Sequence, residues 1–307
     1  MRLIRGLGGI EGASAGCALT IGAYDGLHLG HQALLARLAA RASAARLPAA
    51  LVTFEPMPRE YLKPEDPPAR LTSFRERWRI LSAGRLDHLW LLRFGEALRN
   101  LRAESFAQLL AGAGGARVVV VGHDFRFGYR GEGNAELLEA AGRRLGFEVD
   151  VVAPVELGGE RVSSSRVRAA LARGDFPGAA HCLGRPWSMR ARVIAGERLG
   201  RDLGFPTANL PLERRRAPVE GVFAARVHGI ADAALPAVAS LGTRPTVNGT
   251  RALLEAHVFD FSGDLYGREV EVEFVAKLRA EERFASLALL KAQIERDAEQ
   301  ARGILGC

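Results

Sequence analysis

Cysteine is scarce in this chain of 307 residues, and its three cysteines lie far apart, at positions 17, 182 and 307. No two of them have the close spacing of a metal-binding or redox motif, which argues against a zinc ribbon or a disulfide framework. Long apolar runs are missing too, since none approaches the roughly 18–20 residues of a membrane span. The N-terminal segment 1–6 lacks the apolar core of a signal peptide. These absences predict a cytoplasmic protein with no membrane partner.

Aromatic residues are few, at 7% of the chain, and acidic residues are outnumbered by Lys and Arg, which gives a net charge of +7. A basic protein favours anionic partners, either nucleotides or nucleic acid. A nucleic-acid interface would cluster its cations and interleave them with exposed aromatics. Here the arginines are spread along the chain, and we interpret the one compact run, 214–216, as a solvated loop. The composition therefore favours small nucleotides and predicts no nucleic-acid partner.

Strand and helix patterns alternate through the first part of the chain. Apolar runs predict strands at 17–24, 49–54, 86–94, 117–122 and 147–152. Helical spacing predicts helices near 32–41, 74–83, 103–113, 134–145 and 164–172. This alternation predicts an α/β domain with a parallel, doubly wound sheet.

The pattern changes after Gly184. Short strands separated by Gly, Pro and Asn turns are predicted at 188–195, 221–229, 235–242, 252–261 and 268–278. A closing helix at about 286–301 carries Leu287, Leu290 and Ile294 on one face. Several strands without intervening helices favour an antiparallel barrel or sandwich. The sequence therefore predicts two domains, 1–184 and 185–307, and leaves the oligomeric state open, with a monomer possible.

The loop from Gly22 to His31 carries the first candidate site. It contains His28-Leu-Gly-His31 and joins a predicted strand to a predicted helix. Ligands bind at such turns in α/β sheets, and the helix N-terminus favours phosphate. Two histidines can donate hydrogen bonds to phosphate oxygens as charge builds. The alternative is a pair of solvated loop histidines.

Three further polar segments accompany this loop. Residues 53–59, Thr-Phe-Glu-Pro-Met-Pro-Arg, and 121–128, Val-Gly-His-Asp-Phe-Arg-Phe-Gly, each follow a predicted strand. They are expected at the same sheet edge as His28. Residues 162–168, Val-Ser-Ser-Ser-Arg-Val-Arg, open a helix. The serines there can be simple helix caps, and the arginine that follows can bind phosphate.

The segment from Gly196 to Leu210 is the strongest signal in the second part. Its glycines suit a loop that folds over phosphates, and Thr207 and Asn209 offer two oxygen ligands of the kind Mg²⁺ prefers. A glycine-rich turn with a polar cap is the alternative. Farther on, Glu255 lies in an apolar strand, where an unpaired carboxylate is costly.

These motifs together resemble the bifunctional riboflavin kinase/FMN adenylyltransferase family, the bacterial FAD synthetases. In the first domain the resemblance rests on His-x-Gly-His, Thr-Phe-Glu-Pro, Gly-x-Asp-Phe-x-Phe-Gly and Ser-Ser-Ser-Arg. In the second it rests on Gly-Phe-Pro-Thr-Ala-Asn and on the segments 221–224, 241–248, 254–261 and 264–267, and it covers nearly all of 185–302.

For the first domain, the resemblance implies a Rossmann-like nucleotidyltransferase fold. The phosphate of FMN would attack the α-phosphorus of ATP, giving FAD and pyrophosphate, with His28 and His31 stabilising the ATP phosphates. The other residues that it implies for nucleotide or phosphate binding are Gly22, Asp25, Gly30, Ser164, Ser165 and Arg166. Those that it implies at or near the flavin are Phe54, Asp124 and Phe125.

For the second domain, the resemblance implies a six-stranded Greek-key barrel that transfers the γ-phosphate of MgATP to the ribityl 5′-hydroxyl of riboflavin, giving FMN. Thr207 and Asn209 would bind the Mg²⁺ that accompanies ATP. Glu255 is the candidate base for that hydroxyl, with an interior ion pair or a solvent-facing position as the alternative. We expect Arg279 near the flavin. The loop residues expected at the phosphates are Gly196, Gly200, Gly204 and Pro206.

The chain departs from the family pattern at Met57, which stands where a histidine is common in Phe-Glu-Pro-His-Pro. This departure leaves open a kinase without adenylylation, so three alternatives in all remain beside the two-step enzyme. One is a monofunctional riboflavin kinase, and another is a His-x-Gly-His transferase with a different acceptor, such as pantetheine phosphate. The third is a basic nucleic-acid-binding protein.

Overall fold

The computed structural model describes residues 1–9, 16–196, 200, 203–214, 216–246 and 249–307. Three parts of the predicted motifs lie outside these ranges: residues 197–199 and 201–202 of the glycine-rich loop, Arg215 of the arginine run, and residues 247–248 of the segment 241–248. The chain forms two compact units. Unit 1 comprises 1–68 and 77–163, and unit 2 comprises 69–76 and 164–307. The domain boundary expected at residue 184 stays a prediction.

Unit 1 is built on a six-stranded sheet in which every neighbouring pair is parallel. Its strand order is β1-β4-β3-β2-β5-β6. The strands are β1 (Arg2–Arg5), β2 (Cys17–Ile21), β3 (Ala49–Glu55), β4 (His88–Arg93), β5 (Ala116–Gly122) and β6 (Glu148–Val152). A two-stranded hairpin follows, β7 (Glu156–Leu157) and β8 (Glu160–Arg161). All five residues of β2 are buried, because helices cover both faces of a doubly wound sheet.

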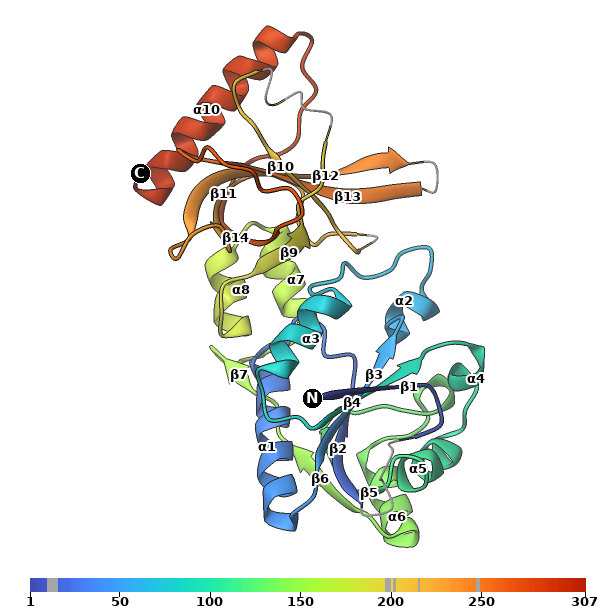
Figure 1. Cartoon of the computed structure of the whole chain (residues 1–307). Helices are drawn as coiled ribbons and strands as arrows, with labels where there is room; N and C mark the ends of the chain where they lie inside the picture. Colours follow the sequence, from blue (N-terminus) through green and yellow to red (C-terminus); the bar gives the residue numbers. More distant parts are fainter. Residues whose placement is uncertain (10–15, 197–199, 201–202, 215, 247–248) are drawn as a thin grey trace. The chain divides into compact units, whose positions relative to one another are not determined.

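Helices flank this sheet on both faces (Figure 1). One apolar cluster joins alternate residues of the strands, such as Leu19 and Val119, to Phe106 of α5 and Leu138 of α6. Helix α1 packs against the same strands, with Leu38 and Ala42 buried. The helices of the first part are α1 (Leu29–Ala45), α2 (Pro58–Leu62), α3 (Phe74–Ser82), α4 (Glu96–Arg99), α5 (Ala103–Ala111), the 3₁₀ turn η2 (Tyr129–Gly131) and α6 (Ala135–Leu145).

Unit 2 contains an antiparallel sheet with the order β10-β13-β12-β11-β14-β9. Within it, the run β14-β11-β12-β13 is a Greek key. A bridge between Ile194 and Asn209 joins the two ends of the sheet, so the barrel is nearly closed. The strands are β9 (Ser188–Arg192), β10 (Ala208–Pro211), β11 (Gly221–His228), β12 (Leu235–Thr246), β13 (Gly249–Val258) and β14 (Glu269–Arg279). The predicted fold class, α/β followed by an antiparallel barrel, is confirmed.

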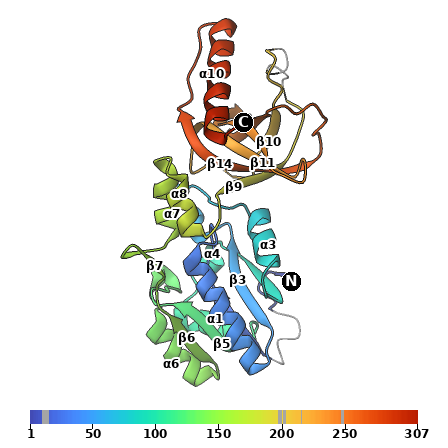
Figure 2. The same ribbon diagram turned by 90° about the vertical axis from the view of Figure 1, so that its left-hand side faces the viewer.

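Helices α7 (Ser164–Ala172), α8 (Phe176–Leu183) and α10 (Leu287–Leu305) complete unit 2. Phe176 of α8 contacts Phe223 and Phe274 of the barrel interior. The C-terminal half of α10 packs on β11, β12 and β14, where Ala298 and Ala301 are buried (Figure 2). This helix therefore covers the outer face of the barrel.

The segment 69–76 joins unit 2 through a buried ion pair. Glu76 accepts from the Arg214 guanidinium at 2.6 Å, and the two side chains are 9% and 1% exposed. The interpretation of 214–216 as a solvated loop is therefore wrong at Arg214. The Glu76 carboxylate also accepts from the backbone N–H of Arg190 at 2.8 Å and of Ser73 at 2.6 Å. A buried charge needs such partners because leaving it alone in the interior is costly.

Candidate active sites

The strand order of unit 1 reverses between β2 and β5. From β2 the chain moves outward through β3 and β4, whereas β5 and β6 lie on the other side of β2. Ligands of open α/β sheets bind outside the carboxyl ends of the strands at such a switch point. The loop 22–28 follows β2 and the loop 123–128 follows β5. Two of the polar loops predicted to meet therefore follow the neighbouring strands of one switch point.

His28 and His31 form one structural element at this point. His28 is the N-cap of α1, and its Nδ1 accepts from the backbone N–H of His31 at 3.4 Å. The two rings stack with centroids 3.7 Å apart. A side chain at Gly30 would place its Cβ 3.2 Å from the His28 ring, so glycine leaves room for that ring.

His31 is held in its neutral form. Burial, with the neighbouring charges of His28 and Arg161, sets the pKa of His31 well below its usual range. Its Nδ1 is buried and has no hydrogen-bond partner among the described residues. The ring also contacts Tyr24, with centroids 4.6 Å apart. A buried ring nitrogen without a partner is a group that an incoming ligand can satisfy.

Asp124 lies beyond β5 and pairs with Arg161 of β8 at 2.6 Å. Both side chains are about half exposed, at 51% and 46%. Phe125 stacks on Phe127 with centroids 5.3 Å apart. The positive charge of Arg161 also contributes to lowering the pKa of His31. One residue of β8 therefore interacts both with Asp124, after β5, and with His31, in the motif after β2. Sequence reasoning missed Arg161, since a two-stranded hairpin leaves almost no periodic signal.

The remaining predicted residues of unit 1 are mostly buried. Asp25 is 3% exposed, and Phe54 belongs to the apolar core, where it meets Phe94 edge-on. A Cβ at Gly22 would lie 2.9 Å from the Tyr24 ring. Met57 is 5% exposed and is the residue before α2. Its backbone N–H donates to Glu60 at 3.0 Å.

The serine segment opens α7, as predicted. Ser164 and Ser165 are the first two helical residues and Arg166 is the third. Ser165 is exposed, while Ser164 and Arg166 are half-buried. These residues lie in unit 2, and His28 lies in unit 1.

In unit 2, Asn209 of β10 and Glu255 of β13 are opposite one another in the sheet register. Ser240 of β12 is opposite Glu255 on its other side. Opposed residues share a face, and Leu254 and Ala256 on the other face are 0% and 1% exposed. Glu255 shares the face of Val238 in the neighbouring strand β12, and Val238 packs in one apolar cluster with Ala298 of α10. That face is the outer one, so the interior location considered for Glu255 is wrong.

The glycine-rich loop packs closely around Asn209. A Cβ at Gly196 would lie 2.4 Å from the Asn209 amide nitrogen, and one at Gly200 would lie 3.4 Å from the Thr207 hydroxyl. The Asn209 amide donates to the Thr207 carbonyl at 3.4 Å, and Asn209 is 8% exposed. Gly204 has a φ of +90°, which favours glycine.

His257 fixes the end of this loop. One of its ring nitrogens lies 2.8 Å from the carbonyl oxygen of the exposed Pro206. Its ring also meets Phe205 edge-on at 5.3 Å between centroids. These contacts give His257 a structural role at the end of the loop.

Arg279 is bound to α10. Its guanidinium donates to both carboxylate oxygens of Asp297, at 2.7 to 3.0 Å, and to the Ala280 carbonyl at 2.9 Å. Asp297 is 3% exposed, so this bidentate pair joins β14 to the helix. Its guanidinium carbon also lies 5.6 Å from the centroid of the Phe284 ring.

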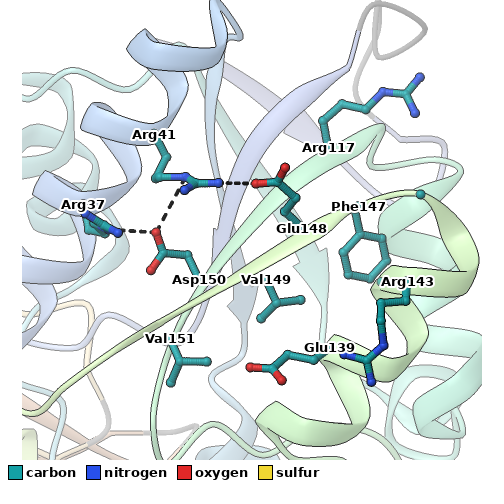
Figure 3. Close-up of a pocket in the computed structure, with 12 residues that line it drawn as sticks. Arg37, Arg41, Arg117, Glu139, Arg143, Phe147, Glu148, Val149, Asp150 and Val151 are labelled. Atoms are coloured by element: carbon teal, nitrogen blue, oxygen red, sulfur yellow. Dashed lines mark hydrogen bonds and ion pairs between the residues drawn. The ribbon is translucent and has the colours of Figure 1, made fainter.

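A separate hollow lies along the β6 edge of unit 1, and none of the predicted site residues lines it (Figure 3). Two of its arginines are neutralised by acids of β6. Arg37 pairs with Asp150 at 2.7 Å, and Arg41 pairs with Glu148 and with Asp150 (Figure 3). We therefore do not assign either reaction to this hollow.

Comparison with known proteins resolves the identity of both domains. Residues 10–166 match the FAD synthetase family model, and residues 183–305 match the riboflavin kinase family model. The bifunctional riboflavin kinase/FMN adenylyltransferase of Escherichia coli K12 is 44% identical over 308 residues, covering 100% of this chain and 98% of that protein. The chain belongs to the bifunctional riboflavin kinase/FMN adenylyltransferase family. It is an enzyme with a domain for each activity, and its substrates include ATP and flavins.

Another bifunctional relative and one solved structure are similar to this chain over nearly its whole length. The bifunctional riboflavin kinase/FMN adenylyltransferase of Pseudomonas fluorescens is 45% identical, covering 99% of this chain and 98% of that protein. A crystal structure titled macrolide-efflux protein, from Streptococcus pneumoniae, has a TM-score of 0.79 and 32% identity over 98% of this chain and 99% of that one. Within the described ranges, no helix is long and apolar enough to cross a membrane.

Proposed function

We propose that the adenylyl transfer of this family is carried out at the β2–β5 switch point of unit 1. His28 and His31 bind the ATP phosphates there while the FMN phosphate attacks the α-phosphorus. The observation that carries this proposal is the buried, unpartnered Nδ1 of His31 beside the helix N-terminus. A phosphate brought to this point supplies an acceptor and favours protonation of the imidazole.

The roles of the other unit 1 residues follow the resemblance. Gly22, Asp25 and Gly30 shape the phosphate loop. Asp124 and Phe125, with Phe54 behind them in the core, form the flavin side. Ser164, Ser165 and Arg166 hold the outgoing phosphates, and the helix N-terminus that carries them favours an anion.

For the kinase, we propose that the outer barrel face between β10 and β12 holds the reacting groups. Glu255 accepts the proton of the ribityl 5′-hydroxyl as that oxygen attacks the γ-phosphorus of ATP. Gly196, Gly200 and Gly204 let the loop approach the phosphates closely. Pro206, whose carbonyl His257 contacts, anchors the end of the loop. The register of Asn209 with Glu255 supports this arrangement. Arg279 and Phe284 line the flavin side.

The donor set at Thr207 and Asn209 fits Mg²⁺. A hydroxyl and an amide carbonyl are hard oxygen ligands, and Mg²⁺ completes its shell with substrate phosphates. The tight contact at Gly196 leaves the Asn209 amide little freedom, which suits a cation that demands fixed geometry. Mg²⁺ held by these residues would neutralise charge on the ATP phosphates. The predicted cytoplasmic location stays a prediction.

Two variants assayed for both activities test these assignments. Replacing His28 and His31 together with Ala should abolish FAD formation from supplied FMN and leave FMN formation from riboflavin intact. Replacing Glu255 with Gln should lower kinase kcat roughly 100-fold, within the range for general-base catalysis, without weakening riboflavin binding. Equal loss of both activities in either variant would contradict the assignment of separate sites. Unchanged kinase turnover would exclude Glu255 as the base.

A further inference from the structure

The phosphate loop of unit 1 is strained. Tyr24 and Leu27 have φ values of 53° and 49°, in the left-handed region that costs energy for residues other than glycine. Both side chains are 1% exposed. Such a conformation persists only where surrounding contacts enforce it. The part of the loop that precedes the histidines therefore needs contacts that hold it in this conformation.

Two of these restraints are local. The Tyr24 hydroxyl lies 2.7 Å from the Thr20 hydroxyl in β2. The Gln32 amide of α1 donates to the Leu27 carbonyl at 2.9 Å. Both contacts join the loop to the elements that it connects, so neither fixes it against the rest of the sheet.

A further restraint comes from Arg77 of α3, in a distant part of the chain. Its guanidinium donates from one terminal nitrogen to the Ala23 carbonyl at 2.7 Å and from the other to Glu55 at 2.7 Å. The first nitrogen also lies 3.4 Å from the Thr53 hydroxyl, which itself lies 3.4 Å from the Ala23 carbonyl. The Arg77 side chain is 2% exposed. The planar guanidinium thus joins the loop after β2 to the end of β3.

We propose that Arg77 is a positioning residue for adenylyl transfer, fixing the backbone of the phosphate loop so that His28 and His31 meet the ATP phosphates. The inference rests on the proposed role of those histidines. Arg77 acts through the Ala23 carbonyl and touches no reacting atom. A displacement of about 1 Å at such a loop lowers catalysis on the order of 100-fold.

The test replaces Arg77 with Met, which keeps much of the stem and removes both donors. We expect kcat for FAD formation from FMN to fall about 100-fold while KM for FMN stays within about twofold, since misplacement acts on the transition state. Kinase kcat on riboflavin in the same preparation should stay within about twofold. A general loosening of unit 1 would instead raise KM for FMN, which would overturn the proposal.

Three companion variants sharpen the result. Arg85→Met, at an exposed arginine of unit 1, should leave both activities unchanged. Arg77→Lys should lower kcat for FAD about tenfold, because one ammonium cannot reproduce the fork between Ala23 and Glu55. This variant carries the test if Arg77→Met does not fold, and unchanged turnover in it would overturn the proposal. The double variant Arg77→Met/Glu55→Gln should stay as slow as Arg77→Met.

The double variant separates two causes. If the loss arose only because Glu55 was left without its cation, neutralising Glu55 would restore activity and overturn the proposal. The variants of His28 and His31 described above test the proposed role of the histidines separately from the role of Arg77. If replacing His28 and His31 spares FAD formation, the proposed role of the histidines fails. If only the histidine variants lose FAD formation, the inference about Arg77 fails alone.

Discussion

A methyl group added at Gly196 tests the kinase site without replacing either of the proposed Mg²⁺ ligands, Thr207 and Asn209. Gly196 does not have a positive φ, so alanine is not strained there by the backbone conformation. The added Cβ would lie 2.4 Å from the Asn209 amide nitrogen and 2.6 Å from two further atoms of that side chain. Ordinary contact begins at 3.4 Å, so the Asn209 amide must move by about 1 Å.

The Asn209 backbone cannot absorb this movement easily. Its carbonyl accepts from Ile194 at 2.9 Å, and β10 pairs with β13 at Glu255. The side chain must therefore rotate away from its place as a proposed Mg²⁺ ligand. A misplacement of this size lowers turnover roughly 100-fold. We expect that loss in kinase kcat for Gly196→Ala, measured as FMN plus FAD formed from riboflavin.

Two controls make the result decisive, one on the same preparation and one on a second variant. FAD formation from supplied FMN should be unchanged, because that activity belongs to the other site. Gly303→Ala is the matched control, since a Cβ there meets nothing within 4 Å and alanine favours the helix. Kinase turnover of Gly196→Ala within twofold of the native chain would refute the reasoning about Asn209.

Two further predictions concern stability. Arg214→Met should lower the free energy of unfolding of unit 2 by about 3–5 kcal/mol, because it leaves Glu76 buried without its cation. The urea concentration at which half of the kinase activity is lost measures this change in stability. Arg75→Met, which removes an ion pair with side chains 74% and 58% exposed, should change that free energy by under about 0.5 kcal/mol. The stability of unit 1 should fall as the pH drops below about 6.5, by at most ~1.4 kcal/mol per pH unit from His31, because the unfolded chain binds a proton that the folded one refuses. Urea unfolding at pH 7.5 and 5.5 should show that the free energy of unfolding depends less on pH in His31→Asn than in the native chain. An equal pH dependence in the two proteins would contradict the neutral state of His31.

Much of the fold was predictable because its elements carry strong periodic patterns. The strands of the parallel sheet are continuous apolar runs, and helix 164–172 was predicted with the bounds that α7 has. Strands β1 and β10 were missed, since each has only four residues. The assignment of segment 69–76 to unit 2 was also invisible, because it depends on the partners of Glu76 far along the chain.

Site residues that belong to a sequence motif were predictable, whereas a site residue that stands alone in the sequence was not. His28 and His31 were found as a motif, and the structure stacks their rings. Arg77 lies in a predicted helix, four residues before the buried Leu81. A charged residue on that buried face was the available signal, but nothing in the sequence names Ala23 and Glu55 as its partners. The residue roles themselves stay predictions.

The most direct test of the account is a time course of riboflavin, FMN and FAD with the native chain, ATP and Mg²⁺ in one reaction. Met57 makes this measurement necessary, since it replaces the histidine common in the family. The account predicts that FMN appears first and that FAD then accumulates at its expense. Accumulation of FMN with no FAD above background would contradict the central claim that both sites of this chain are active.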